Sequence, residues 1–167
     1  VGVGVRGGGG RQAWLRSLPP GASVPRRGRA SGDEARGFEW LWFPERCHIP
    51  TSRKSPWPGG AGLPKWYYDT YDPFVAMGAA AVVTKTIKLG TGVVSLPYHH
   101  PYNVAQRMVQ LDWMTGGRAI LGPGPGALAS AAHTPGLDPV TPRDRPDEAI
   151  AVVRGLSKGE RVTASGP

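Results

Sequence analysis

The chain has 167 residues, of which 40% are hydrophobic, and this is enough for one ordinary domain but too short for a complete large α/β barrel. It carries a net charge of +8 and contains 25 glycines and 18 prolines, a composition that approaches that of disordered chains. A single cysteine, Cys47, excludes an internal disulfide, and no run of 18 apolar residues indicates a membrane helix. We therefore expect a cytoplasmic protein that does not associate with a membrane.

The basic charge is concentrated in residues 1–32. This segment holds six of the 20 Lys and Arg residues and no acid, which leaves 14 basic against 12 acidic residues in the remainder. Because so many glycines, prolines and arginines cannot bury enough apolar surface, we predict a disordered tail over residues 1–32. Such a tail could bind nucleic acid through its arginines, but it lacks the interleaved aromatic residues that stack on bases. A non-enzymatic module with a nucleic-acid-binding tail is therefore the weaker alternative.

Ordered structure is expected from Asp33 onward. The sequence predicts the end of a helix stopped by Gly37, then a strand over residues 38–43 whose aromatic and apolar run suits a sheet buried on both faces. Residues 48–71 form a long loop rich in proline, glycine and aromatic side chains. A loop of this length in a compact domain is commonly functional, and its aromatic residues could line an apolar pocket or anchor the loop.

Helices and strands alternate after this loop. Asp72 and Pro73 predict the N-cap and first residue of a helix that runs to about Lys85. The following elements are a strand over residues 87–96, a helix over 101–114, a strand over 118–121 and a helix over 144–156. This alternation predicts right-handed βαβ units on a parallel sheet of three strands.

Polar or glycine-rich segments follow each predicted strand. They are residues 45–48, 98–100 and 122–126. Because the carboxyl ends of parallel strands meet at one edge, the three segments are expected to form one pocket.

Two histidines, His99 and His100, precede the helix opened by Pro101. Imidazole titrates near neutrality, so these side chains could bind or transfer protons near a ligand. Alternatively, one of them caps the helix and the other is solvated. No metal site is expected, because the histidines show no ligand spacing.

The glycine-rich segment that follows the last predicted strand allows close approach to a phosphate or planar ring, or is simply a turn. It is not a dinucleotide fingerprint, because Pro123 and Pro125 lack amide protons.

These segments together resemble the bacterial luciferase-like flavin monooxygenase family, from about Asp33 to Val162. The resemblance is carried by GFEWLWFPERCHIP, by YDPFVAMGAAAVVTKTIKLGTGVVSLPYHHPYNVAQRMVQLDWMTGGRAILGPGPGALAS and by RDRPDEAIAVVRGLSKGERVT, in the family's order. Residues 97–103 are most similar to the limonene-monooxygenase-like branch. The segments TSRKSPWPGG and LPKWYYDTYDPF are also similar to relatives that use reduced deazaflavin.

The resemblance implies an α/β fold, a (β/α)8 TIM barrel that binds reduced flavin at its carboxyl rim. In this family reduced FMN comes from a separate flavin reductase and, with oxygen, oxidises a small apolar organic substrate. A homodimer packed through the helices at 73–85 and 101–114 is implied as well. A deazaflavin-dependent oxidoreductase of the same fold is the alternative.

The resemblance also assigns roles to individual residues. The family often has a non-proline cis peptide behind the flavin ring, and the matching bond is Gly92–Val93. The residues expected to hold the cofactor are Gly92, Val93, Ser95, Gly122, Gly124 and Gly126. The catalytic candidates are His48, His99 and His100, and the candidate substrate contacts are Glu45, Trp66 and Tyr68.

The sequence departs from the family pattern at two places. The family often has Glu-His-His after this strand, whereas here Arg46 and Cys47 follow Glu45, so that His48 is displaced and Cys47 is interpreted as a buried thiol. The family's first strand and the later barrel strands have no counterpart. We therefore expect an incomplete luciferase-like barrel over residues 33–167, with activity impaired by truncation.

Overall fold

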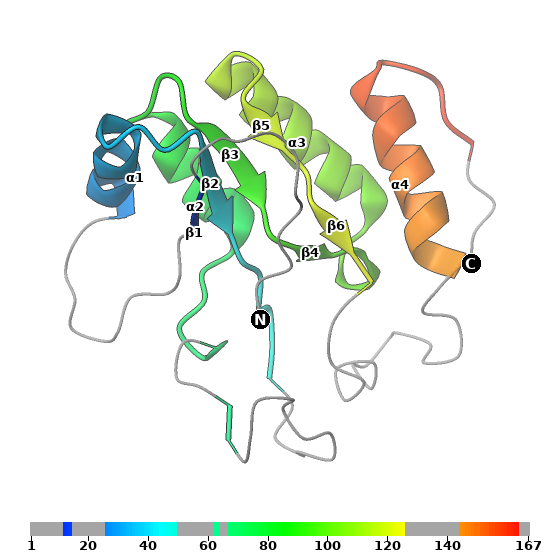
Figure 1. Ribbon diagram of the computed structural model, residues 1–167. Coiled ribbons are helices and arrows are strands. Elements are labelled where there is room, and N and C mark those ends of the chain that lie inside the picture. Colours follow the sequence, from blue (N-terminus) through cyan, green and yellow to red (C-terminus); the bar gives the residue numbers. More distant parts are fainter. Residues whose placement is uncertain (1–11, 15–25, 50–61, 64–66, 126–143, 164–167) are drawn as a thin grey trace.

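The computed structural model of the protein describes residues 12–14, 26–49, 62–63, 67–125 and 144–163. Within them, four parallel strands form a sheet in the order β1-β2-β3-β5, and β4 pairs with β6 in a second parallel sheet (Figure 1). The strands are β1 (Gln12–Trp14), β2 (Trp40–Phe43), β3 (Lys88–Thr91), β4 (Val94–Ser95), β5 (Ala119–Ile120) and β6 (Pro123–Gly124). The helices are α1 (Arg26–Ala35), α2 (Pro73–Ala81), α3 (Pro101–Thr115) and α4 (Asp144–Ser157), and a 3₁₀ turn spans Leu96–Tyr98.

The helices follow one another across the molecule in chain order (Figure 1). α2 packs against β2 and β3, α3 packs against β5, and α1, α2, α3 and α4 contact their neighbours in that order. Parallel strands alternating with packed helices are βαβ units, so the predicted α/β fold with a parallel sheet is confirmed. Four such strands make up about half of an eight-stranded barrel.

The core lies between this sheet and α2 and α3. Leu41 and Phe43 of β2 are almost completely buried, as are Leu89 of β3 and Met77 of α2. The prediction that this strand is buried on both faces is wrong, because alternate residues of β2 face away from the helices and are only partly buried.

Order begins earlier than the sequence predicted. β1 pairs in register with β2, and α1 starts at Arg26, with Ala30 fully buried in the core. The prediction of a disordered tail and of a boundary at residue 33 is therefore wrong for residues 12–14 and 26–32. The edge strand β1 is held by backbone hydrogen bonds to β2, and the amino-acid composition of residues 1–32 does not indicate such bonds. Residues 1–11 and 15–25 lie outside the described part of the chain.

The predicted strand over residues 87–96 divides at the Gly92–Val93 bond. This bond is a cis peptide, as the family resemblance implied. β3 ends before it and pairs with β2 and β5, while β4 follows it and pairs with β6.

The helix caps agree with the sequence. Asp72 Oδ1 accepts a hydrogen bond from the Val75 amide at 3.0 Å and so caps α2, which ends at Ala81 rather than near Lys85. Gly116 follows the last residue of α3 and caps its carboxyl end. Its φ of 64° is a left-handed conformation that glycine adopts without strain. Most of the predicted loop over residues 48–71 lies outside the described residues.

Glu34, near the end of α1, forms hydrogen bonds with the turn that precedes β3. Its Oε1 accepts hydrogen bonds from the amides of Thr86 and Ile87 at 2.6 and 2.9 Å, and the Lys85 amide donates to the same carboxylate at 2.9 Å. Burial raises the pKa of Glu34, but the hydrogen bonds outweigh it and lower the pKa from 4.5 to about 2. The ionised carboxylate therefore stabilises the fold.

Arg118, which follows α3, holds the same turn from the opposite side. Its guanidinium donates to the carbonyl oxygens of Ile87 at 2.6 Å and Thr84 at 2.9 Å. Its Nε donates to the Thr115 carbonyl at 2.9 Å and so binds the end of α3 to the start of β3. The amino ends of the strands are thus held by two charged side chains that bond to backbone.

Replacing Glu34 by glutamine is expected to lower the free energy of unfolding at pH 7 by about 1 to 2 kcal/mol, after allowance for solvent screening. Because the folded pKa is depressed, this stabilisation is present above about pH 4.5 and is lost as the pH falls toward 2. Urea unfolding at several pH values should show the two proteins converging in stability over that range. Asp33→Asn, which removes the carboxylate that pairs with Arg36 at 3.8 Å, is the control and should change stability by less than about 0.5 kcal/mol. A pH-independent difference for Glu34→Gln would contradict the assignment.

Candidate active site at the carboxyl ends of the strands

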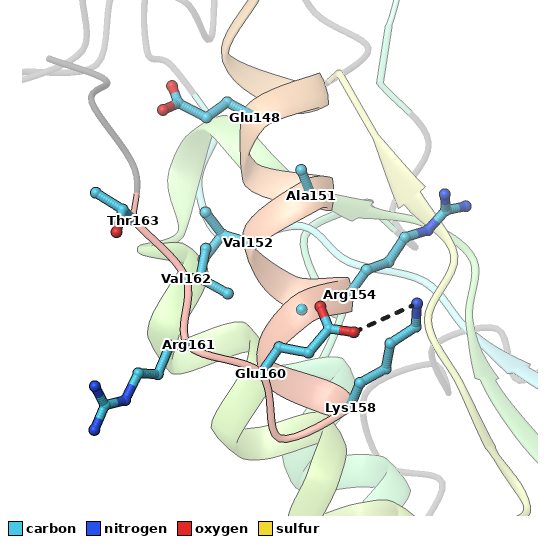
Figure 2. A pocket seen from close by; sticks show the side chains of 10 residues that line it. Glu148, Ala151, Val152, Arg154, Lys158, Glu160, Arg161, Val162 and Thr163 are labelled. Atoms are coloured by element: carbon cyan, nitrogen blue, oxygen red, sulfur yellow. Dashed lines mark ion pairs between the residues drawn. The ribbon is translucent and has the colours of Figure 1, made fainter.

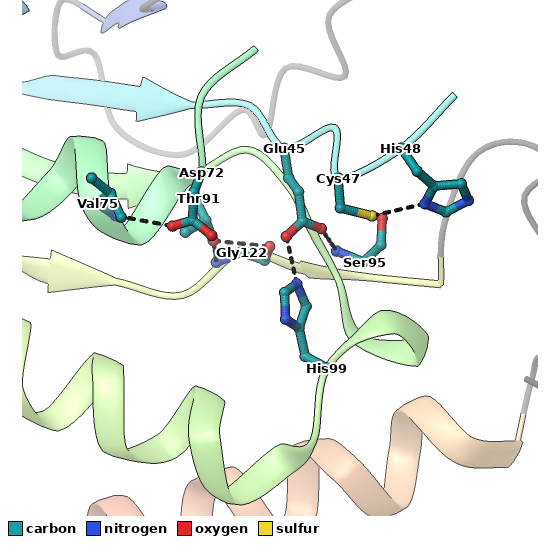
Figure 3. A network of polar contacts seen from close by, with 9 residues as sticks. All are labelled: Glu45, Cys47, His48, Asp72, Val75, Thr91, Ser95, His99 and Gly122. Atoms are coloured by element: carbon teal, nitrogen blue, oxygen red, sulfur yellow. Dashed lines mark hydrogen bonds and ion pairs between the residues drawn. The ribbon is translucent and has the colours of Figure 1, made fainter. Parts of the chain in front are cut away.

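Glu45 links the end of β2 to the segment that follows β3. Its side chain is 4% exposed, its Oε2 accepts a hydrogen bond from the Ser95 amide at 2.7 Å, and its Oε1 lies 2.5 Å from His99 Nε2 (Figure 3). Because an ionised carboxylate only accepts hydrogen bonds, the His99 proton lies on Nε2. The carboxylate therefore fixes both the position of the imidazole and its proton-bearing nitrogen. We call Glu45, Ser95 and His99 the rim cluster.

His99 and His100 have different surroundings. The His99 side chain is 13% exposed and stands edge-on to Phe74, with ring centroids 6.1 Å apart. His100 is exposed, and its Nδ1 accepts a hydrogen bond from the Tyr102 amide at 3.3 Å, which caps α3. The capping interpretation thus holds for His100, whereas the expectation that the other histidine is solvated is wrong for His99.

His48 lies beside Cys47 rather than in the rim cluster (Figure 3). The Cys47 Sγ is 3.0 Å from His48 Nδ1, and the His48 ring stands edge-on to Tyr98 at 5.0 Å. Cys47 is exposed, so the interpretation as a buried thiol is wrong. Partial burial raises the pKa of its thiol, and the charge of Glu45 raises it further, so the thiol stays protonated at neutral pH.

Gly122 packs directly against Thr91. The Thr91 hydroxyl donates to the Gly122 carbonyl at 3.1 Å and accepts from the Gly122 amide at 2.8 Å, and Thr91 is fully buried. A Cβ at Gly122 would lie 2.2 Å from the Thr91 carbonyl oxygen, and one at Gly124 would lie 2.8 Å from Val93 Cγ2. Strand packing alone therefore accounts for both glycines.

The remaining residues that were predicted to contact the substrate or the cofactor are not part of the rim cluster. Tyr68 is 57% exposed and Val93 is 49% exposed, so both offer apolar surface to solvent. Trp66 and Gly126 lie outside the described residues. Sequence reasoning missed Thr91 and Phe74 as neighbours of the site, and no local motif could have indicated them, because their contacts join distant segments.

A cavity of about 440 Å³ lies elsewhere, over α4 and the segment that follows it (Figure 2). It is lined by Glu148, Ala151, Val152, Arg154, Gly155, Lys158, Glu160, Arg161, Val162 and Thr163. No residue of the rim cluster borders it. None of the described candidate site residues borders this cavity.

Comparison with known proteins identifies the family. The family described as luciferase-like monooxygenase matches residues 26–167. The chain belongs to the luciferase-like monooxygenase family. Limonene 1,2-monooxygenase of Rhodococcus erythropolis is 53% identical over 91 residues, which are 54% of this chain and 24% of that protein. 4-Hydroxyprotoasukamycin monooxygenase of Streptomyces nodosus subsp. asukaensis is 50% identical over 88 residues, 53% of this chain and 24% of that protein. The chain thus matches about a quarter of the length of these two luciferase-like relatives.

Solved luciferase-like structures share the fold. The oxygenating constituent of 3,6-diketocamphane monooxygenase from Pseudomonas putida, in complex with FMN, aligns with a TM-score of 0.74 at 20% identity and covers 94% of this chain and 41% of that one. The coenzyme F420-dependent tetrahydromethanopterin reductase of Methanopyrus kandleri aligns with a TM-score of 0.55 at 24% identity, over 89% of this chain and 39% of that one. These likenesses establish a partial TIM-barrel fold. Among the described residues, no helix is long and apolar enough to cross a membrane.

Proposed function

We propose that this chain forms part of a flavin-dependent monooxygenase site that uses reduced FMN and oxygen to oxidise a small apolar organic molecule. The observation that carries the proposal is the rim cluster, a buried carboxylate that orients an imidazole at the carboxyl ends of parallel strands. Enzymes of this fold class carry their chemistry at that edge. Membership in a family of monooxygenases supports the same reading.

The residues at the rim fit a flavin. Val93 presents an exposed apolar side chain, and Ser95 and His99 follow it with polar groups, which suits a ring that is apolar on its faces and polar at its edge. Gly122 and Gly124 would lie near the ribityl or phosphate portion. Reduced FMN, when bound, supplies the reaction with oxygen.

Residues of the chain itself would then hold the His99 imidazole in place and transfer protons. Glu45 holds the His99 Nε2 proton, which leaves Nδ1 as the nitrogen that can accept or return a proton at the substrate. Phe74 packs against the imidazole and keeps water from that side. His48 and His100 are assigned no step, because one lies against Cys47 and the other caps α3.

The proposed partners are a separate flavin reductase and a second copy of the chain. Exposed apolar side chains on α2 and α3, namely Val75, Trp113 and Met114, and Val82 directly after α2 support a homodimer packed through these helices. A cytoplasmic location suits a protein that depends on a supply of reduced flavin.

Reduced deazaflavin is the second candidate cofactor. The 5,10-methylenetetrahydromethanopterin reductase of Methanopyrus kandleri is 44% identical over 68 residues, 39% of this chain and 20% of that protein. The solved reductase named for coenzyme F420 shares the fold. A titration with both cofactors separates the two.

The purified protein is expected to bind reduced FMN saturably, with a rise in melting temperature, and to bind reduced deazaflavin more weakly. With a flavin reductase present, His99→Gln should lower substrate-dependent oxygen consumption by about 10²- to 10⁴-fold, the usual contribution of a positioned acid or base. FMN affinity should change little. His100→Asn, which keeps a capping side chain, is the matched control and should retain activity. No saturable flavin binding by the unaltered protein would refute the proposed function.

A further inference from the structure

Arg46 follows Glu45 at the end of β2 and carries an unused hydrogen-bond donor. Its guanidinium carbon lies 4.6 Å from the centre of the Tyr67 ring, so the planar group stacks on the aromatic face. Its Nε is buried and has no acceptor. Among the residues that the structure describes, Arg46 takes part in no ion pair. A buried donor without an acceptor destabilises a protein unless a ligand supplies one.

The neighbouring carboxylate does not neutralise Arg46. Glu45 uses its two oxygens for the Ser95 amide and for His99. Burial raises the pKa of both the Cys47 thiol and the Tyr98 phenol, while the positive charge of Arg46 acts to lower them. The guanidinium charge therefore acts on Cys47, beyond the end of β2, and on Tyr98 in the 3₁₀ turn.

We infer that Arg46 forms an oxyanion-binding subsite and receives the carboxylate of an otherwise apolar substrate. This inference rests on the proposed function, and it narrows the substrate to apolar molecules with an acidic end. A guanidinium presents donors in a planar fork that matches the two oxygens of a carboxylate, and stacking on Tyr67 holds that fork in one orientation. The acid would thereby be anchored within reach of the rim cluster.

Asp69, in the turn that follows Tyr67, is the competing explanation. Its Oδ2 is also buried without a hydrogen-bond donor, and it forms no ion pair with Arg46. If Asp69 closed onto Arg46 in solution, the subsite would be filled by the protein itself. Asp69→Asn distinguishes the cases, because it should leave carboxylate binding unchanged if the subsite is open and should strengthen it if Asp69 occupies Arg46.

The test is calorimetric titration of the 167-residue protein with octanoate and with 1-octanol, which share a chain but differ in charge. The protein should bind octanoate at least about tenfold more tightly than octanol, as expected for charge-assisted hydrogen bonds. Arg46→Gln should abolish the preference, and Arg46→Lys should keep part of it, since lysine retains the charge but not the fork. Arg36→Gln, at an exposed arginine beyond α1, is the matched control and should bind like the unaltered protein.

Three outcomes would overturn the inference, provided that a cooperative melt shows Arg46→Gln to be folded. Equal binding of octanoate and octanol would remove the oxyanion subsite. Loss of octanoate binding in Asp69→Asn would show that Arg46 does not act alone. If Arg46→Gln weakened binding of FMN but not of riboflavin, the oxyanion would be the cofactor phosphate and not a substrate carboxylate. Because octanoate binding needs no flavin, failure of flavin binding alone would refute only the proposed function.

Discussion

Glu45→Ala is expected to lower the free energy of unfolding by about 3 kcal/mol, the scale seen when one partner of a buried polar pair is removed. The substitution leaves the Ser95 amide and His99 Nε2 without their acceptor in a largely buried setting. It also detaches the end of β2 from β4, so oxygen consumption should fall along with stability. Urea unfolding followed by circular dichroism measures the first effect, and an oxygen electrode measures the second.

Glu39→Ala is the matched control for this change. Glu39 immediately precedes the same strand, and its side chain is exposed. Its replacement should alter stability by less than about 0.5 kcal/mol. Equal effects of the two substitutions would mean that the rim cluster does not hold the strand ends together.

Gly122→Ala should destabilise the protein by about 3 kcal/mol, at the upper end for overpacking, because the new Cβ meets backbone rather than a movable side chain. That Cβ would lie 2.2 Å from the Thr91 carbonyl oxygen, so β3 and the segment leading to β6 would have to separate. The paired hydrogen bonds between the Thr91 hydroxyl and Gly122 would be lost as well. The midpoint of urea unfolding reports the change.

Gly78→Ala provides the contrasting substitution within the same protein. Gly78 lies inside α2, and a Cβ there would meet nothing within 4 Å. Alanine is favoured over glycine in a helix, so this change should raise stability by about 0.5 to 1 kcal/mol. A similar loss for both glycines would show that the close contact at Gly122 is not the cause.

Local sequence patterns determined much of the fold. Asp72 and Pro73 marked the start of α2, and Gly116 closes α3 close to the predicted end. The edge strand β1 was missed because it owes its place to pairing with β2, which lies outside its own segment. The same limitation explains why the order of α1 was underestimated: Ala30 is buried by partners distant in sequence.

The candidate site was only partly predictable. The sequence placed Glu45 and His99 at one edge of a parallel sheet, and the family resemblance added Ser95, but neither could show that Glu45 bonds to the other two. Adjacent histidines looked equivalent in sequence, whereas backbone geometry turns His100 toward the Tyr102 amide and His99 toward Glu45. Arg46 was seen only as a departure from the family pattern, because its buried Nε depends on tertiary packing.

Glu34 and Arg118 hold the sheet from the end that carries no candidate catalytic residue. Substitutions at the opposite edge therefore leave these attachments intact. Arg46 and Cys47, which stand where the family resemblance implied two histidines, lie at that opposite edge. Substrate preference can therefore change by single substitutions at the rim while the hydrogen bonds of Glu34 and Arg118 keep the opposite edge of the sheet in place.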